Sequence, residues 1–284
     1  MSLAAHPGIA ELEALVARFR AGEAEVATAF FAAPRPLAQH RYWLRFQVAR
    51  EARNLEEIAS GLLTRLVQEV EQALPREELV HRLTEDYQEV GHYAMLAYLY
   101  EGLTGEPVRW QPLRAEIKTA DWYALSRAEH ARWAELRAHG TPLELAAALF
   151  TRGGGGALFY GLLQVRGADY ETLLADAARS ILHDELEHGA SEGRDDLYRR
   201  VRTDADVARA REIIAELSLL RLRMRNAQFS GVLPEARIQA IAAGDIAPLT
   251  LDALWAACQG AGGPDWYARY HAAPKPLTAT TVLR

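Results

Sequence analysis

Apolar side chains recur at every third or fourth position along most of this chain, the spacing that aligns them on one face of an α-helix. The longest such run is expected over residues 37–74. Its apolar stripe consists of Leu55, Ala59, Leu62, Leu66 and Val70. The alternation of apolar and polar residues that is typical of strands is scarce, and no repeat of about 20 to 50 residues is evident. The pattern therefore predicts an all-α fold.

Prolines, glycines and polar clusters divide this pattern into separate helices. The predicted helices cover about residues 9–32, 37–74, 76–103, 120–138, 143–165, 170–192 and 205–229, followed by short helices near 235–243 and 251–258. Pro75 and Gly167 each separate two long helices by a short turn, which predicts two helical hairpins. Thr141 and Pro142 have the residue types of a helix cap and a first-turn proline.

The order of these helices predicts three parts of the chain. Residues 1–36 would form an N-terminal helical extension. Residues 37–192 would form a four-helix bundle with an inserted helix near 120–138. Residues 193–284 would form C-terminal helices and a loose tail rich in Gly and Pro.

The most informative residues are two Glu-x-x-His pairs, Glu89–His92 and Glu185–His188, one in the second helix of each hairpin. Residues three apart share a face of a helix, so each pair presents a carboxylate beside an imidazole. A third pair, Glu78–His81, opens its helix directly after a proline. Its acidic residue is better explained by a favourable interaction with the helix dipole.

On these two pairs the chain resembles the ferritin-like superfamily over about residues 37–192. The resemblance implies a bundle in which the first helix of each hairpin adds a Glu and the second adds a Glu-x-x-His, together holding two metal ions. Carboxylates with one imidazole per metal suit iron or manganese. The implied function is a non-haem di-iron or di-manganese oxidoreductase that activates O₂ or peroxide to oxidise or hydroxylate a small substrate.

The two further carboxylates can be sought by reflecting each motif through its hairpin turn. Glu89 reflects to near position 57–61, where Glu56 and Glu57 are the nearest candidates. Glu56 has the more apolar neighbours at helical spacing, so we expect Glu56 to be the ligand and Glu57 the alternative. Both could instead belong to an exposed Glu–Arg ladder.

The second hairpin offers no carboxylate at the reflected position, near residues 149–152. Glu144 is the acidic residue of that helix, and it is either a ligand or a first-turn residue that stabilises the helix dipole. Four glycines, residues 153–156, cost about 3–4 kcal/mol of helix propensity relative to alanine. They predict either a cavity wall beside the metals or a simple break in the helix.

Other polar residues near the motifs compete for roles. Glu85 shares the face of Glu89 and is a rival ligand, and Glu192 could accept a proton from the other ring nitrogen of His188. His183 and Asp184 are expected to face away from the ligand side of their helix. Three further cationic residues are spaced by two and should spread around a helix as solvated side chains. They are Arg221, Arg223 and Arg225.

Two alternatives remain open. The chain is also similar to haem-oxygenase-like di-iron oxidases, in which Glu85 and His92 would match a Glu-x₆-His pattern and Glu185 the later acidic motif. Ile181 stands where that group has a further His, which counts against it. A metal-free helical protein used for binding or assembly is the other alternative.

Composition limits the classes of partner. A net charge of −6 argues against a general nucleic-acid binder. Lone Cys258 excludes a disulfide framework and a four-Cys zinc site. No basic-then-apolar leader and no stretch of about 18 apolar residues is present, so we expect a cytoplasmic protein without a membrane partner. The expected partners are a small-molecule substrate and O₂, with an electron-donor protein and a homodimer as further options.

Overall fold

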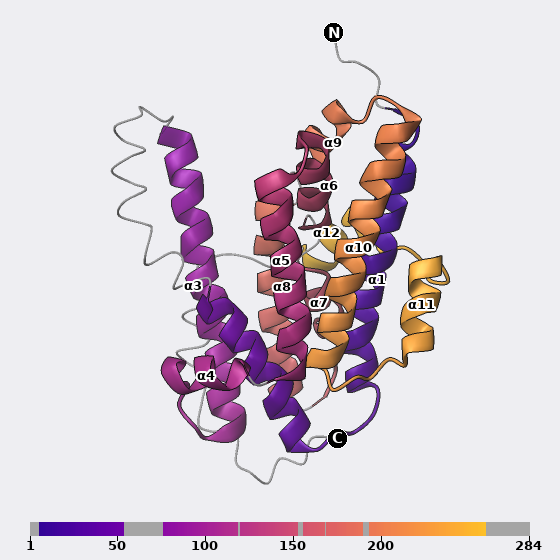
Figure 1. Cartoon of the computed structure of the whole chain (residues 1–284). Coiled ribbons are helices and arrows are strands. Elements are labelled where there is room, and N and C mark those ends of the chain that lie inside the picture. Colours follow the sequence, from indigo (N-terminus) through magenta and orange to yellow (C-terminus); the bar gives the residue numbers. More distant parts are fainter. Residues whose placement is uncertain are drawn as a thin grey trace.

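The computed structural model describes residues 6–53, 76–118, 120–152, 156–167, 169–189 and 193–259. Within these ranges the chain is almost wholly helical and contains no strand, so the prediction of an all-α fold is confirmed. Figure 1 shows long helices that run roughly side by side, with shorter helices packed at their ends and sides.

Most helices begin and end close to the positions where prolines, glycines and caps predict their ends, whereas the two short helices Trp110–Ile117 and Arg194–Arg200 were not predicted. They are α1 (Ile9–Phe31), a helix of residues 37–53, α3 (Arg76–Thr104), α4 (Trp110–Ile117), α5 (Asp121–His139), α6 (Pro142–Arg152), α7 (Ala157–Leu162), α8 (Asp169–Gly189), α9 (Arg194–Arg200), α10 (Asp204–Gln228), α11 (Glu235–Ala243) and α12 (Leu251–Cys258).

The helix expected over residues 143–165 is divided in two. α6 ends at Arg152 and α7 begins at Ala157, with the glycine run between them. Each glycine lowers helix stability by about 1 kcal/mol relative to alanine, so four in succession favour a break. Gly156 is placed close to α8, because a Cβ atom added there would lie 2.5 Å from Leu182 Cδ1 and 3.4 Å from Glu185 Cβ.

The N-terminal helix belongs to the core of the molecule. α1 packs against α7 and α10, and α10 in turn packs against α5 and α6. The α1–α7 crossing is close, since a Cβ atom at Gly161 would lie 2.4 Å from the Ala24 carbonyl oxygen. Phe30 of α1 is fully buried and packs edge-on against Phe229 beyond the end of α10. The segment expected as an extension therefore helps to build the fold.

α3 and α8 lie side by side and carry the two Glu-x-x-His motifs. α7 covers another side of α8, and α12 also packs on it. Because α8 is surrounded by helices, its inward side chains lie in the interior of the molecule, close to those of α3.

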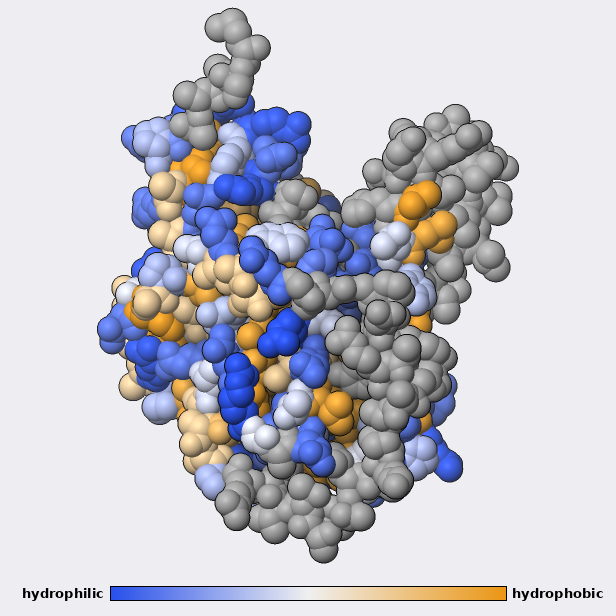
Figure 2. All heavy atoms as spheres, turned by 180° about the vertical axis from the view of Figure 1, so that it is seen from behind, coloured by the Kyte–Doolittle hydropathy of each residue, from blue (hydrophilic) through white to orange (hydrophobic). Residues whose placement is uncertain are grey.

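None of the helices in the described ranges is both long enough and apolar enough to cross a lipid bilayer. The face shown in Figure 2 is mainly hydrophilic, with small apolar areas between the polar side chains.

Candidate metal centre

Three helices bring a group of carboxylates around one histidine. Glu51 lies near the end of the described part of helix 37–53, Glu89 and His92 lie on α3, and Asp184 and Glu185 lie on α8. Ligand atoms of Glu51, Glu89 and His92 lie within 4.8 Å of one another. The two Glu-x-x-His motifs therefore meet through Glu89, His92 and Glu185.

His92 is the centre of this group and is 0% exposed. Its Nε2 lies 3.2 Å from Asp184 Oδ2, within hydrogen-bond distance. Its Nδ1 lies 3.8 Å from Glu89 Oε2 and 3.9 Å from Glu185 Oε1. In a neutral imidazole that donates from Nε2, the lone pair is on Nδ1 and points toward the two glutamates. This is the tautomer that a metal bound at Nδ1 requires.

The distances suit a cation held between these atoms. Two ligand atoms that each lie about 2.1 Å from one ion are roughly 3–4 Å apart, depending on the angle at the ion. The separations of 3.8 and 3.9 Å around His92 Nδ1 fall in this range. They are also too long for direct hydrogen bonds.

The electrostatics of the group reflect a crowding of negative charge. Burial alone would lower the pKa of His92, but the hydrogen bond to Asp184 and the charges of Glu185, Glu89 and Glu51 outweigh it and raise the pKa to about 9. Burial raises the pKa of Glu185, as does the charge of Glu51, against the opposing effect of His92. Carboxylates this close together are costly unless a positive charge joins them.

A chain of buried amides holds Glu51 in place. Gln47 Nε2 donates to Glu51 Oε1 at 2.6 Å. Gln47 Oε1 in turn accepts from Arg225 Nη1 at 2.9 Å and from Gln228 Nε2 at 3.0 Å. Gln47, Glu51, Arg225 and Gln228 are all buried. The rotamer of Glu51 is therefore fixed by residues from helix 37–53 and α10.

A second set of buried charges continues from Arg225 into the molecule. Arg225 Nε lies 3.7 Å from Glu23 Oε2, and burial raises the pKa of that carboxyl. Arg221 lies 3.3 Å from Glu129 and donates to the Thr151 carbonyl oxygen at 3.0 Å. The expectation that these arginines are solvated was wrong for Arg221 and Arg225, because carboxylates from α1 and α5 pair with them inside the fold. Of the three, only Arg223 is an outer residue, and it pairs with Glu235.

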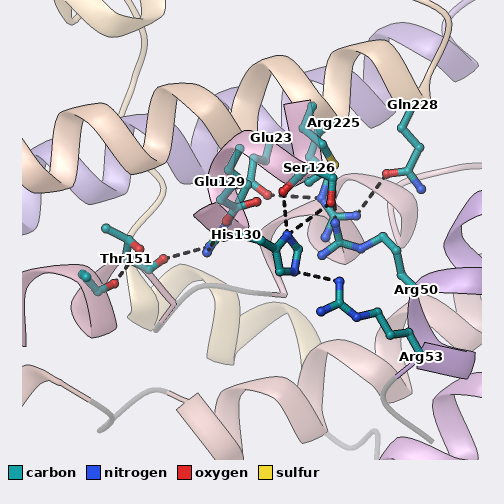
Figure 3. Close-up of polar contacts among 12 residues, drawn as sticks. Glu23, Arg50, Arg53, Ser126, Glu129, His130, Thr151, Arg225 and Gln228 are labelled. Atoms are coloured by element: carbon teal, nitrogen blue, oxygen red, sulfur yellow. Dashed lines mark hydrogen bonds and ion pairs between the residues drawn. The ribbon is translucent and has the colours of Figure 1, made fainter. Parts of the chain in front are cut away.

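Figure 3 shows how residues from several helices converge in this region. Arg53 reaches His130, whose Nε2 lies 2.9 Å from Arg53 Nη1. His130 Nδ1 lies 2.5 Å from the Ser126 carbonyl oxygen, which favours a proton on Nδ1 and a lone pair on Nε2. Arg50 points into the same region, where its Nη1 lies 3.4 Å from Met224 Sδ.

Several residues expected at the metal site lie elsewhere or outside the described residues. Glu144 accepts from the Thr141 backbone N–H at 2.7 Å and from Arg209 on α10, so the structure uses it as a helix cap and an ion-pair partner. Glu85 lies on α3, one turn before Glu89. Glu56, Glu57 and Glu192 lie outside the described residues. Glu78 and His81 belong to α3, and His188 belongs to α8, by their backbone alone.

Sequence reasoning missed Glu51 and Asp184. The sequence offered one indication of Glu51: it lies one turn after Gln47, with Ala49 and Ala52 close by. The structure shows that these four residues are buried. Asp184 was expected to face away from the ligand side of α8. The structure shows that its side chain faces His92 on α3, because consecutive residues of α8 can lie on either side of one side chain from the neighbouring helix.

Comparisons with protein-family models, with curated proteins and with solved structures find no match to this chain.

Proposed function

We propose that the group around His92 binds divalent iron or manganese, two ions per chain, and that the protein is an oxidoreductase that uses O₂ or peroxide to oxidise a small substrate. The observation that supports this most is the buried imidazole whose Nδ1 faces two glutamates while its Nε2 is held by a third carboxylate.

The donor set fits the proposed metals. Glu51, Glu89 and Glu185 offer carboxylate oxygens and His92 offers an imidazole nitrogen. Such oxygen-rich sets suit iron and manganese better than copper(I), which prefers sulfur. His188, one turn after Glu185 on α8, is the proposed nitrogen ligand of the second ion. The set would then contain three carboxylates and two imidazoles, without Glu144.

Bound iron or manganese would supply the redox chemistry, by passing electrons to O₂ or peroxide. The chain's own residues prepare the site. Asp184 accepts the Nε2 proton of His92, so Nδ1 is the ring nitrogen that gives up its proton when a cation binds. Gln47 restrains Glu51 through a hydrogen bond from its Nε2 to Glu51 Oε1 and so fixes the orientation of that carboxylate. Glu185, with its raised pKa, can hold a proton at its carboxyl when no cation is present.

The test is metal content after anaerobic loading with Fe(II) or Mn(II) and removal of free metal. The wild type should retain about two ions per chain, and Glu51→Gln, His92→Gln and Glu185→Gln should each lose at least one. Glu129→Gln is the matched control, because Glu129 is an equally buried carboxylate that pairs with Arg221 instead.

Helix content measured on the same samples separates metal loss from unfolding. Retention of metal by all three variants, or a wild type that retains none while folded, would overturn the metal-centre proposal. Oxygen uptake by the loaded Fe(II) protein tests the redox part separately: uptake that is abolished in His92→Gln supports it, and a loaded wild type that consumes no O₂ in the presence of a reductant counts against it.

A further inference from the structure

A cleft of about 270 Å³ opens between helix 37–53, the end of α3 and the segment that leads into α4. Most of its wall is apolar. The apolar lining consists of Val48, Tyr100, Pro107, Val108, Pro112 and Leu113. Val48, Tyr100 and Leu113 are buried residues of the core, so the inner end of the cleft is built by rigid helices.

One arginine of the cleft has no carboxylate partner among the described residues. Glu106 lines the cleft but is bound by Arg41, with 2.5 Å between Arg41 Nη2 and Glu106 Oε2. Arg45 also lines the cleft, and its Nη2 lies 2.5 Å from Glu116 Oε2. Arg109 is exposed at the rim and forms no ion pair with any described residue.

A concave site with apolar walls and one unpaired guanidinium suits a molecule that is apolar along its length and carries one negative charge at one end. The planar guanidinium of arginine matches a carboxylate through two parallel hydrogen bonds. A doubly charged group such as a phosphate is less suited, because Glu106 and Glu116 lie nearby and a single arginine would compensate it only in part.

We propose that this cleft binds a small monocarboxylate with an apolar body, of about ten non-hydrogen atoms. The carboxylate pairs with Arg109 at the rim, and the apolar body lies on Tyr100 and Leu113 with its far end at Val48. Val48 stands one helical turn before Glu51, about 4.5 Å along the helix axis. The ligand's apolar end would thus be the part nearest the proposed metal centre, although binding itself does not depend on metal.

The test is a calorimetric titration of the metal-free, full-length protein with octanoate, compared with octan-1-ol and acetate. Octanoate should bind saturably at one site. Octan-1-ol lacks the carboxylate and acetate lacks the apolar body, so each should bind at least about tenfold more weakly. Arg109→Gln should weaken octanoate binding by about tenfold. Arg127→Gln, which changes an exposed arginine of α5 outside the cleft, should leave the affinity unchanged.

A second variant tests the place of the apolar body. Val108→Trp puts a large side chain at the wall of the cleft on a connecting segment, and should abolish octanoate binding with unchanged helix content. Absence of saturable octanoate binding to the wild type, equal binding of octan-1-ol, or wild-type affinity in Arg109→Gln would each overturn the proposal. Since no metal is present, none of these results bears on the metal centre.

Discussion

Replacement of Asp184 by asparagine tests how the chain prepares His92. The carboxylate of Asp184 accepts the Nε2 proton of His92 across 3.2 Å. An asparagine has nearly the same shape but no charge, and it can present an N–H group that would favour the other tautomer. His92 would then carry its proton on Nδ1, the atom that faces Glu89 and Glu185. Asp184→Asn should therefore weaken metal binding without removing any ligand.

The magnitude follows from two features of the site. Loss of a carboxylate that orients a metal-ligating histidine typically lowers metal affinity by about 10–100-fold, or roughly 1.4–2.7 kcal/mol. The hydrogen bond to Asp184 is also the largest of the influences that raise the pKa of His92 to about 9, so that pKa should be lower in the metal-free variant. A lower pKa also reduces the competition between protons and metal for Nδ1, so the two affinities are compared after correction for the measured pKa of His92 in each protein.

Two measurements check this prediction. Competitive titration with a chelator gives the metal affinity, and nitrogen NMR of the imidazole gives the tautomer and pKa of His92. Glu187→Gln is the control, because Glu187 lies on the same helix and contacts Gln88, as Asp184 does, but has no hydrogen bond to His92 in the described structure. An Asp184→Asn protein with wild-type metal affinity and an unchanged pKa at His92 would refute the assigned role of Asp184.

Three further predictions concern stability. Burial and the charge of Arg35 lower the pKa of His40 to about 4, so the unfolded chain binds a proton that the folded protein does not between about pH 6.5 and pH 4. The free energy of unfolding of the wild type should therefore fall as the pH drops through this window, and His40→Gln should remove up to about 3 kcal/mol of that fall in urea titrations. Equal falls in both proteins would contradict the argument. Arg225→Met should cost about 3–5 kcal/mol, because Glu23, Gln47 and Gln228 lose their cationic partner, and adding Glu23→Met should recover part of that loss; additive losses in a double-mutant cycle would show that the pair does not interact. Gly156→Ala should cost about 1–3 kcal/mol in denaturant, since the new Cβ would lie 2.5 Å from Leu182 Cδ1 and would displace that buried side chain on α8; wild-type stability would show that Leu182 can repack without cost.

Much of the fold follows from the sequence, because helix ends depend on local chemistry. The inserted helix expected near 120–138 is α5, Asp121–His139, and the helix after Thr141 begins at Pro142. The glycine run predicts a cavity wall or a break in the helix. α6 ends at Arg152 and α7 begins at Ala157, and Gly156 is the one glycine between them that the structure describes. The spacing within a helix also predicts that Glu89 and His92 share a face, which the structure shows.

The position of one helix relative to another is harder to predict. Reflection through Pro75 pointed to Glu56 and Glu57, which lie outside the described residues, and gave no reason to consider Glu51. The register of a hairpin depends on packing along its whole length, and a count of residues from the turn does not contain that information. The same holds for Asp184, whose role depends on the close packing of α8 against α3.

The burial of charged side chains was also not predicted from the sequence. A charged side chain in a helix is most often solvated, because burial without a partner is costly. Arg221 and Arg225 are exceptions because their partners come from distant helices: Glu129 from α5 and Glu23 from α1. Neither partnership leaves a local pattern in the sequence, so only the three-dimensional arrangement reveals it.

The most direct test of the metal-centre proposal is anomalous diffraction at the iron absorption edge from crystals of the Fe(II)-loaded protein. The account predicts anomalous peaks between Glu51, Glu89, His92 and Glu185, with His92 Nδ1 as a ligand atom and Asp184 still hydrogen-bonded to Nε2. Well-diffracting, iron-loaded crystals that show no peak at this position, or a peak only between His183, Asp184 and Glu187 of α8, would contradict it.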